Sequence, residues 1–187
     1  MTGIWVATYA LWIIPEIALS RRLRSASDAQ KVDRGSKAIV IASINIGVFF
    51  AFLAADTVPS LTIGAHWKTV FACGIAVWLC GIVLRLYSIR ILGRFFTYDV
   101  AIANGQRVVE KGPYRWLRHP SYLGGLLAML GFGMTLTNWL AILIPVVCTA
   151  AGYAYRIPVE EKALVRGLGP AYSEYMGRTW RLIPYVY

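Results

Sequence analysis

Charged side chains are scarce in this sequence of 187 residues, and acidic ones especially so. Asp, Glu, Lys and Arg make up only 15% of the residues, with 9 acidic residues and 19 Lys and Arg. Hydrophobic residues make up 58% of the chain, and its mean hydropathy is +0.57. A water-soluble domain carries about a quarter charged residues. This composition therefore excludes an ordinary cytosolic enzyme.

Motifs for metals, disulfides and dinucleotides are also missing. The 3 cysteines (Cys73, Cys80 and Cys148) lie in apolar runs without a Cys-x-x-Cys pair, so we interpret them as small core hydrophobes. The 2 histidines, His66 and His119, have no metal-ligand spacing to other donors, and no Gly-x-Gly-x-x-Gly follows a strand. We therefore expect neither a metal centre nor a Rossmann cofactor domain.

Long hydrophobic runs dominate what is present. A bilayer core about 30 Å thick takes about 20 apolar residues as a helix. The run between His119 and Arg156 has no residue charged at neutral pH and is too long for one span, so we expect two short spans with a turn near Thr137-Asn138. The sequence thus predicts an all-α integral membrane protein, a single domain over 1–187 with five transmembrane helices at about 3–20, 38–55, 67–92, 120–136 and 138–156.

The basic residues support this count. Segments 21–37, 90–118 and 156–187 hold 17 of the 19 Lys and Arg, whereas 56–66 holds none, and five spans place the three basic segments on one side. The positive-inside rule then predicts an N-terminus outside and a C-terminus in the cytoplasm. Because orientation explains the net charge of +10, we expect membrane lipids and no nucleic acid as partners.

The expected location follows from the same pattern. The basic cluster comes after the first apolar run rather than before it, so we interpret this run as a retained span and not as a cleaved signal peptide. The protein is expected to be multi-pass, in the cell (inner) membrane of a prokaryote or the endoplasmic reticulum of a eukaryote.

Two polar segments, 93–119 and 156–187, are each below the roughly 40 residues that an independent domain needs. Any cytosolic site is therefore expected to be built from both. In the first, Asn104-Gly105 stands between alternating runs, which predicts either a β-hairpin or a loop that follows the membrane surface. In the second, we expect a short helix after Gly169-Pro170 and an apolar end that packs back onto the membrane surface.

Several residues near the ends of spans allow two interpretations. Trp116, Arg118 and Tyr122 are either interfacial anchors or site residues. Glu16 and Arg85 are the two charges inside spans; they either pair with each other, or Arg85 extends its head group to the interface.

The adjacent acids Glu160-Glu161 run against the basic bias of their segment. Without a functional role, they are typical of the first turn of a helix, where the macrodipole favours Glu. Adjacent helical side chains point about 100° apart, so we expect at most one of the two to face a shared pocket.

Two motifs together carry a resemblance. Gly112-Pro113-Tyr114-x-x-x-Arg118-His119-Pro120-Ser121-Tyr122-x-Gly124 is followed by Arg156-x-x-x-Glu160-Glu161 and by the Tyr-x-x-Tyr and Ile-Pro of the tail. With them, the sequence from Phe95 to Tyr185 resembles the isoprenylcysteine carboxyl methyltransferase family, part of a wider group that includes phospholipid methyltransferases. The resemblance implies a membrane enzyme that moves a methyl group from S-adenosylmethionine to a lipid-like acceptor, at a pocket open to the cytosol.

The resemblance also implies roles for single residues. Arg156 would face the acceptor, and His119 would be the base for an acceptor that needs one. Many relatives have histidine at the position of Gln106. The implied cofactor contacts are Gln106, Val108, Val109, Tyr114, His119, Pro120, Ser121, Tyr122 and Glu160.

Physical chemistry is consistent with these roles. The Glu160 carboxylate can accept hydrogen bonds from ribose hydroxyls. The ring faces of Tyr114 and Tyr122 attract a cationic sulfur with ~0.5–2 kcal/mol each. Arg156 supplies a fork of donors for a carboxylate or phosphate.

The acceptor stays open at this point: a carboxylate, hydroxyl or amine of a lipid-like molecule, which includes isoprenoids. Two other functions compete with this one. The first is a membrane reductase of the sterol and steroid type that uses NADPH, and the second is a non-catalytic membrane binding protein.

Overall fold

The structure is a computed structural model that describes residues 30–31, 35–97, 100–102 and 105–184. The expected first span, 3–20, and its Glu16 lie outside the described residues. The elements in chain order are β1 (Gln30–Lys31), α2 (Ser36–Thr57), η1 (Pro59–Leu61), α3 (Trp67–Leu92), η2 (Gly93–Phe95), β2 (Ala101–Ile102), η3 (Gly112–Arg115), α4 (Pro120–Thr135), α5 (Trp139–Leu168) and α6 (Pro170–Gly177).

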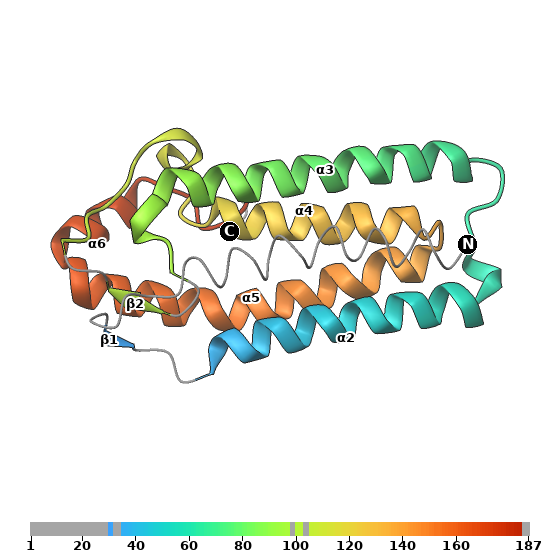
Figure 1. Cartoon of the computed structure of the whole chain (residues 1–187), viewed down its shortest axis with the longest axis horizontal. Helices are drawn as coiled ribbons and strands as arrows, with labels where there is room; N and C mark the ends of the chain where they lie inside the picture. Colours follow the sequence, from blue (N-terminus) through green and yellow to red (C-terminus); the bar gives the residue numbers. More distant parts are fainter. Residues whose placement is uncertain (1–29, 32–34, 98–99, 103–104, 185–187) are drawn as a thin grey trace.

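The four long helices form a row in which α3 packs on α4, α4 on α5 and α5 on α2 (Figure 1). Three stretches, Ser36–Thr57, Trp67–Phe95 and Trp139–Leu168, are long and apolar enough to cross a membrane, whereas α4 has only 16 residues. The prediction of a helical integral membrane protein is confirmed. The number of five spans and the orientation of the termini stay predictions.

Large apolar side chains cover the outside of the helices, as expected for surfaces that face lipid. Their outward-facing members are Ile39, Ile41, Ile46, Phe49, Phe50 and Leu53 of α2, Leu79, Val83 and Leu86 of α3, and Leu143 and Val147 of α5. Inside, a core joins all four helices around Ala51, Trp78, Met129 and Ala141.

Helices α3 and α4 approach each other closely through glycine. A Cβ atom added to Gly124 would lie 2.7 Å from the backbone nitrogen of Arg85, and one added to Gly74 would lie 2.9 Å from that of Thr135. Such distances leave no room for a side chain, so these glycines let the backbones meet. This seam fixes the first turns of α4, which carry the site, against α3.

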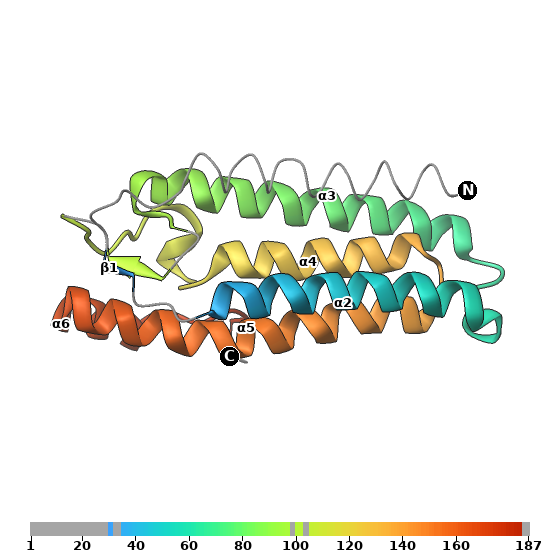
Figure 2. The same cartoon turned by 60° about the horizontal axis from the view of Figure 1, so that its bottom comes forward.

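The predicted turn near Thr137-Asn138 is confirmed. Asn138 begins α5, and its side-chain oxygen accepts hydrogen bonds from the backbone N–H groups of Leu140 (3.0 Å) and Ala141 (3.2 Å). Its amide group also donates to the carbonyl of Val58 at 2.9 Å. Asn138 therefore caps one helix and ties it to the end of α2, at the end of the bundle opposite the site (Figure 2).

Helix α5 continues without a break past residue 156 to Leu168 and includes Pro158. Where the last span leaves the membrane stays a prediction. A proline inside a helix removes one backbone hydrogen bond, but α5 runs on beyond it. Glu160 and Glu161 consequently lie inside a helix, and their interpretation as its first turn is wrong.

Of the two alternatives for the stretch around Asn104-Gly105, the hairpin is wrong, and a loop that follows the membrane surface stays a prediction. In the described residues, Ala101–Ile102 pairs antiparallel with Gln30–Lys31, before α2, and the residues after Gly105 form no strand. Asn104 lies outside the described residues. A short pairing between distant segments has thus replaced the local one that Asn-Gly indicates.

The predicted short helix of the tail is confirmed as α6. From there the chain returns to the start of α4 (Figure 1), where the backbone N–H of Arg118 donates to the carbonyl of Trp180 at 2.8 Å and that of His119 donates to Arg181 at 3.1 Å. Leu182 is buried. The tail therefore packs on the protein itself, beside the first turn of α4.

Candidate active site

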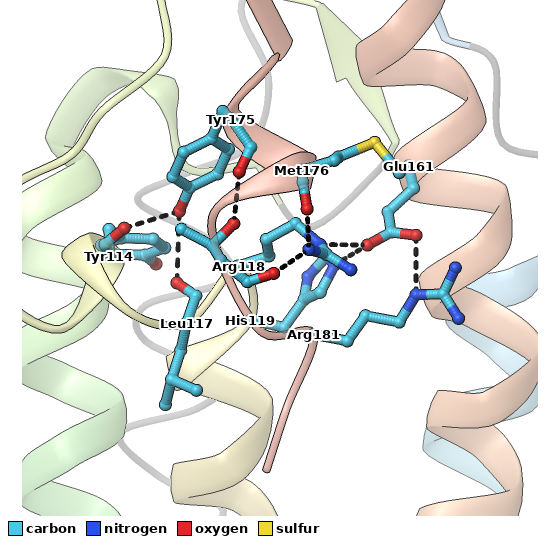
Figure 3. Close-up of polar contacts among 9 residues, drawn as sticks. Tyr114, Leu117, Arg118, His119, Glu161, Tyr175, Met176 and Arg181 are labelled. Atoms are coloured by element: carbon cyan, nitrogen blue, oxygen red, sulfur yellow. Dashed lines mark hydrogen bonds and ion pairs between the residues drawn. The ribbon is translucent and has the colours of Figure 1, made fainter. Parts of the chain in front are cut away.

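The side chains of the two motifs meet where α4 begins. The segment 114–122 approaches from one side, the second half of α5 lies opposite, and the tail after α6 crosses between them (Figure 3). As predicted, both polar segments contribute. The polar side chains form two neighbouring groups, each centred on one of the adjacent acids.

The outer cluster consists of Arg118, His119, Glu161 and Arg181. The carboxylate of Glu161 is buried and accepts from Nε of Arg118 at 2.8 Å and from Nε of Arg181 at 2.9 Å, and Nε2 of His119 lies 3.3 Å away (Figure 3). One carboxylate thus joins the start of α4, the middle of α5 and the tail.

Arg118 also binds backbone of the tail. Its guanidinium donates to the carbonyl of Met176 at 2.9 Å and to that of Thr179. Close by, the hydroxyl of Tyr175 donates to the carbonyls of Tyr114 (2.7 Å) and Leu117 (3.2 Å). Burial raises the pKa of the Tyr175 hydroxyl, so it stays a neutral donor. These contacts fix the tail on segment 114–119.

The inner cluster consists of Ser36, Tyr122, Arg156 and Glu160. The hydroxyl of Tyr122 donates to Oε2 of Glu160 at 2.6 Å and accepts from Nε of Arg156 at 2.8 Å. A second nitrogen of Arg156 donates to Oγ of Ser36 at 2.8 Å. Arg156 is buried, with 5% of its surface exposed, whereas Glu160 is half-buried.

Aromatic rings hold Tyr122 in place. Its ring stacks on His119, with centroids 5.5 Å apart, and on Tyr153, with centroids 4.5 Å apart. Tyr153 fits because Gly125 opposite has no side chain; an added Cβ would collide with the Tyr153 hydroxyl. The ring of Tyr122 is thus fixed by stacking, and its hydroxyl serves the inner cluster.

The other predicted residues lie around this centre. Pro120 and Ser121 form the first turn of α4, and the Tyr114 side chain of η3 is buried. Burial, and then the negative charge of Glu160, raise the pKa of Tyr114. Three further predicted contacts, Gln106, Val108 and Val109, are half-buried in the irregular stretch before η3.

The structure decides two of the open interpretations. Arg118 and Tyr122 are bound into the two clusters and are not interfacial anchors, while Trp116 is 63% exposed, as an anchor would be. Arg85 is buried and donates to the carbonyl of Ser121 at 3.3 Å, so its extension to the interface is wrong. Its pairing with Glu16 stays a prediction.

Sequence reasoning missed part of the site. Both acids contact residues 118–122, Glu161 through Arg118 and His119 and Glu160 through Tyr122, so each points into a different cluster. The expectation that at most one of them faces a shared pocket stays a prediction. Glu161 had a signal, its place in the motif. Ser36 and Arg181 had none, because their contacts join segments far apart in the chain.

Comparisons with known proteins agree with these motifs. The sequence model of the isoprenylcysteine carboxyl methyltransferase (ICMT) family matches residues 74–166. Protein-S-isoprenylcysteine O-methyltransferase B of Arabidopsis thaliana is 32% identical over 123 residues, which are 65% of this chain and 62% of that protein. Protein-S-isoprenylcysteine O-methyltransferase of Saccharomyces cerevisiae is 30% identical over 73% of this chain and 57% of its own length.

A solved structure is similar in fold. The eukaryotic intramembrane Ras methyltransferase ICMT superimposes with a TM-score of 0.62 at 28% identity, over 80% of this chain and 52% of that one. The chain thus spans about three fifths of the plant relative and about half of the solved protein. The matched residues include Arg118, His119, Tyr122, Arg156 and both acids, but neither Ser36 nor the tail.

Proposed function

We propose that this chain belongs to the ICMT family, whose sequence model matches residues 74–166, and that it is an integral-membrane methyltransferase that uses S-adenosylmethionine. We further propose that the acceptor is the carboxylate of an isoprenylated cysteine, the class that the names of its relatives give. The single observation that carries this proposal is that the Tyr122 hydroxyl bonds both Arg156 and Glu160. Arg156 is a cation suited to bind a carboxylate, and Glu160 is an anion suited to bind a ribose.

The residues present fit this cofactor. A carboxylate has about four lone-pair positions, so Glu160 can accept from ribose hydroxyls in addition to Tyr122. Tyr114 of η3 would add a ring, and His119 and Ser121 at the start of α4 would add polar groups. Gln106, Val108 and Val109 would complete the contact from the half-buried stretch before η3. When bound, S-adenosylmethionine supplies a methyl group activated by a positively charged sulfur.

Arg156 would bind and orient the acceptor. Its guanidinium has five N–H donors in a planar fork that matches a carboxylate. In a buried site such a pair is stronger than in water, and holding the acceptor in one geometry supplies much of the rate enhancement of a two-substrate reaction. A lipid-like acceptor would reach it from the bilayer.

The position of His119 favours a carboxylate over a hydroxyl or phenol. A carboxylate needs no base to remove a proton before it accepts a methyl group, whereas a hydroxyl does. Nε2 of His119 faces Glu161 at 3.3 Å and the ring is 4% exposed. We propose that His119 orients Glu161 and Tyr122 and takes no proton from the acceptor.

The orientation is proposed from charge. Among the described residues, the end of the bundle that carries the site also carries nearly all Lys and Arg, and Lys68 is the exception at the other end. The positive-inside rule places this end in the cytoplasm. We propose a multi-pass protein of the cell membrane or, in a eukaryote, of the endoplasmic reticulum.

The test is methyl transfer by the purified protein from labelled S-adenosylmethionine to N-acetyl-S-farnesylcysteine. We expect label in the farnesylcysteine and none when its carboxylate is already a methyl ester. Arg156→Ala should raise the KM for the acceptor more than the Kd for S-adenosylhomocysteine. Binding of S-adenosylhomocysteine without transfer to this acceptor would refute the acceptor class, and absence of binding would refute the methyltransferase itself.

A further inference from the structure

We propose that Ser36 is a positioning residue of the acceptor site: it fixes the guanidinium of Arg156 from α2. The inference rests on the proposed function and adds a residue from outside the part that the family matches, 74–166. It names what the first described helix contributes to the chemistry.

The first step is the contact itself. Oγ of Ser36 accepts a hydrogen bond from a terminal nitrogen of Arg156 at 2.8 Å, across 120 residues of sequence. Both residues are buried, with 1% and 5% of their surface exposed. A hydrogen bond to a charged group that is shielded from water is among the stronger ones in a protein.

The second step concerns how the chain places Ser36. Ser36 is the first residue of α2, after the N-cap Gly35. Gly35 has a φ of +106°, which glycine adopts readily. The turn at Gly35 leads the chain into α2 with Ser36 against Arg156, which places its hydroxyl in the inner cluster.

The third step is the geometry of the guanidinium. Tyr122 holds Nε and Ser36 holds a terminal nitrogen, so the two contacts lie at different corners of one rigid plane. Two contacts at different corners set the direction of the plane more tightly than either contact alone. An arginine side chain carries about 2 kcal/mol of rotamer entropy. If its orientation is already fixed, less of this entropy is lost when the methyl acceptor binds.

The experiment compares three variants of the full-length protein in detergent. Ser36→Ala removes the hydroxyl oxygen that Arg156 bonds, and Ser36→Thr keeps a hydroxyl. Ser43→Ala is the matched control, because Ser43 lies two turns along α2 and bonds the carbonyl of Val40 within the helix. For each we would measure kcat and KM for N-acetyl-S-farnesylcysteine and the Kd for S-adenosylhomocysteine.

We expect Ser36→Ala to raise the acceptor KM about tenfold, with the Kd for S-adenosylhomocysteine changed less than about twofold. Ser36→Thr should recover most of the loss, and Ser43→Ala should match the wild type. A purely structural role would weaken both ligands together. Equal KM values for Ser36→Ala and Ser43→Ala, or a parallel loss of both ligands, would overturn the inference.

Failure of the proposed function would look different, since the wild type itself would then transfer no methyl group. In that case the contact is tested by thermal unfolding of Ser36→Ala, Arg156→Ala and the double variant. Non-additive losses of Tm would support the fixing of Arg156 by Ser36. Additive losses would refute it.

Discussion

The inner and outer clusters are centred on adjacent acids, and they differ in how fully the protein occupies each carboxylate. Glu161 accepts from two arginines, lies beside a histidine, and is buried. Glu160 is half-buried and bonds Tyr122. A carboxylate surrounded by protein cations holds segments together, whereas one with remaining capacity can receive a ligand. We therefore propose that the outer cluster stabilises the fold and that the inner cluster binds ligand.

Removal of the outer acid tests the comparison most severely. Glu161→Ala leaves Arg118, whose side chain is only 9% exposed, without its anion, and breaking a buried ion pair costs about 3–5 kcal/mol. We expect a large fall in the free energy of unfolding, measured by thermal denaturation in detergent, with Glu174→Ala, an exposed acid of α6, as the control. A Tm equal to that of the control would remove the structural role of Glu161.

Removal of the inner acid should affect binding and leave folding nearly unchanged. Glu160→Gln keeps the shape of the side chain but loses the charge, and hydrogen bonds to charged groups contribute about 1.5–3 kcal/mol. The affinity for S-adenosylhomocysteine, measured by calorimetry, should fall at least about tenfold. If instead Tm falls as far as in Glu161→Ala while affinity is kept, the two acids have exchanged roles.

Tyr122→Phe separates the two halves of the inner cluster. The ring keeps its stacking on His119 and Tyr153, but Arg156 and Glu160 lose the hydroxyl between them. A buried hydrogen-bonded group lost in this way costs about 1–3 kcal/mol. We expect both the acceptor KM and the Kd for S-adenosylhomocysteine to rise, whereas Glu160→Gln should change the second alone. A change in only the acceptor KM or only the Kd for S-adenosylhomocysteine would show that the Tyr122 hydroxyl does not link the acceptor site at Arg156 to the cofactor site at Glu160.

Local signals in the sequence were sufficient for much of this arrangement. Hydropathy indicated the described helices, Asn138 marked a helix start, and the two motifs identified Tyr122, Arg156 and Glu160. The errors arise where a distant segment decides. Local rules favoured a hairpin at Asn104-Gly105 and a first helical turn at Glu160-Glu161, but β2 pairs with the distant β1 and α5 runs through both acids.

The acid pair shows the same limit at the level of single residues. The 100° rule describes the divergent directions of Glu160 and Glu161 on α5 correctly, but it does not say which surface lies opposite them. That surface is made by residues 118–122 and by the returning tail. No periodicity within one helix predicts what another segment, about forty residues away in sequence, presents to it.

The smallest expected effect lies at the solvent edge of the outer cluster. Arg181 bonds Glu161 at 2.9 Å, but 31% of its side chain is exposed, whereas that of Arg118 is 9% exposed. Because water screens such a pair, Arg181→Ala should cost at most about 1 kcal/mol of unfolding free energy, and Arg118→Ala clearly more. Raised salt should shrink the Arg181 effect and leave the Arg118 effect nearly unchanged. Equal losses of unfolding free energy in both variants, unchanged by salt, would mean that the contact at Arg181 fixes the tail as firmly as the contact at Arg118.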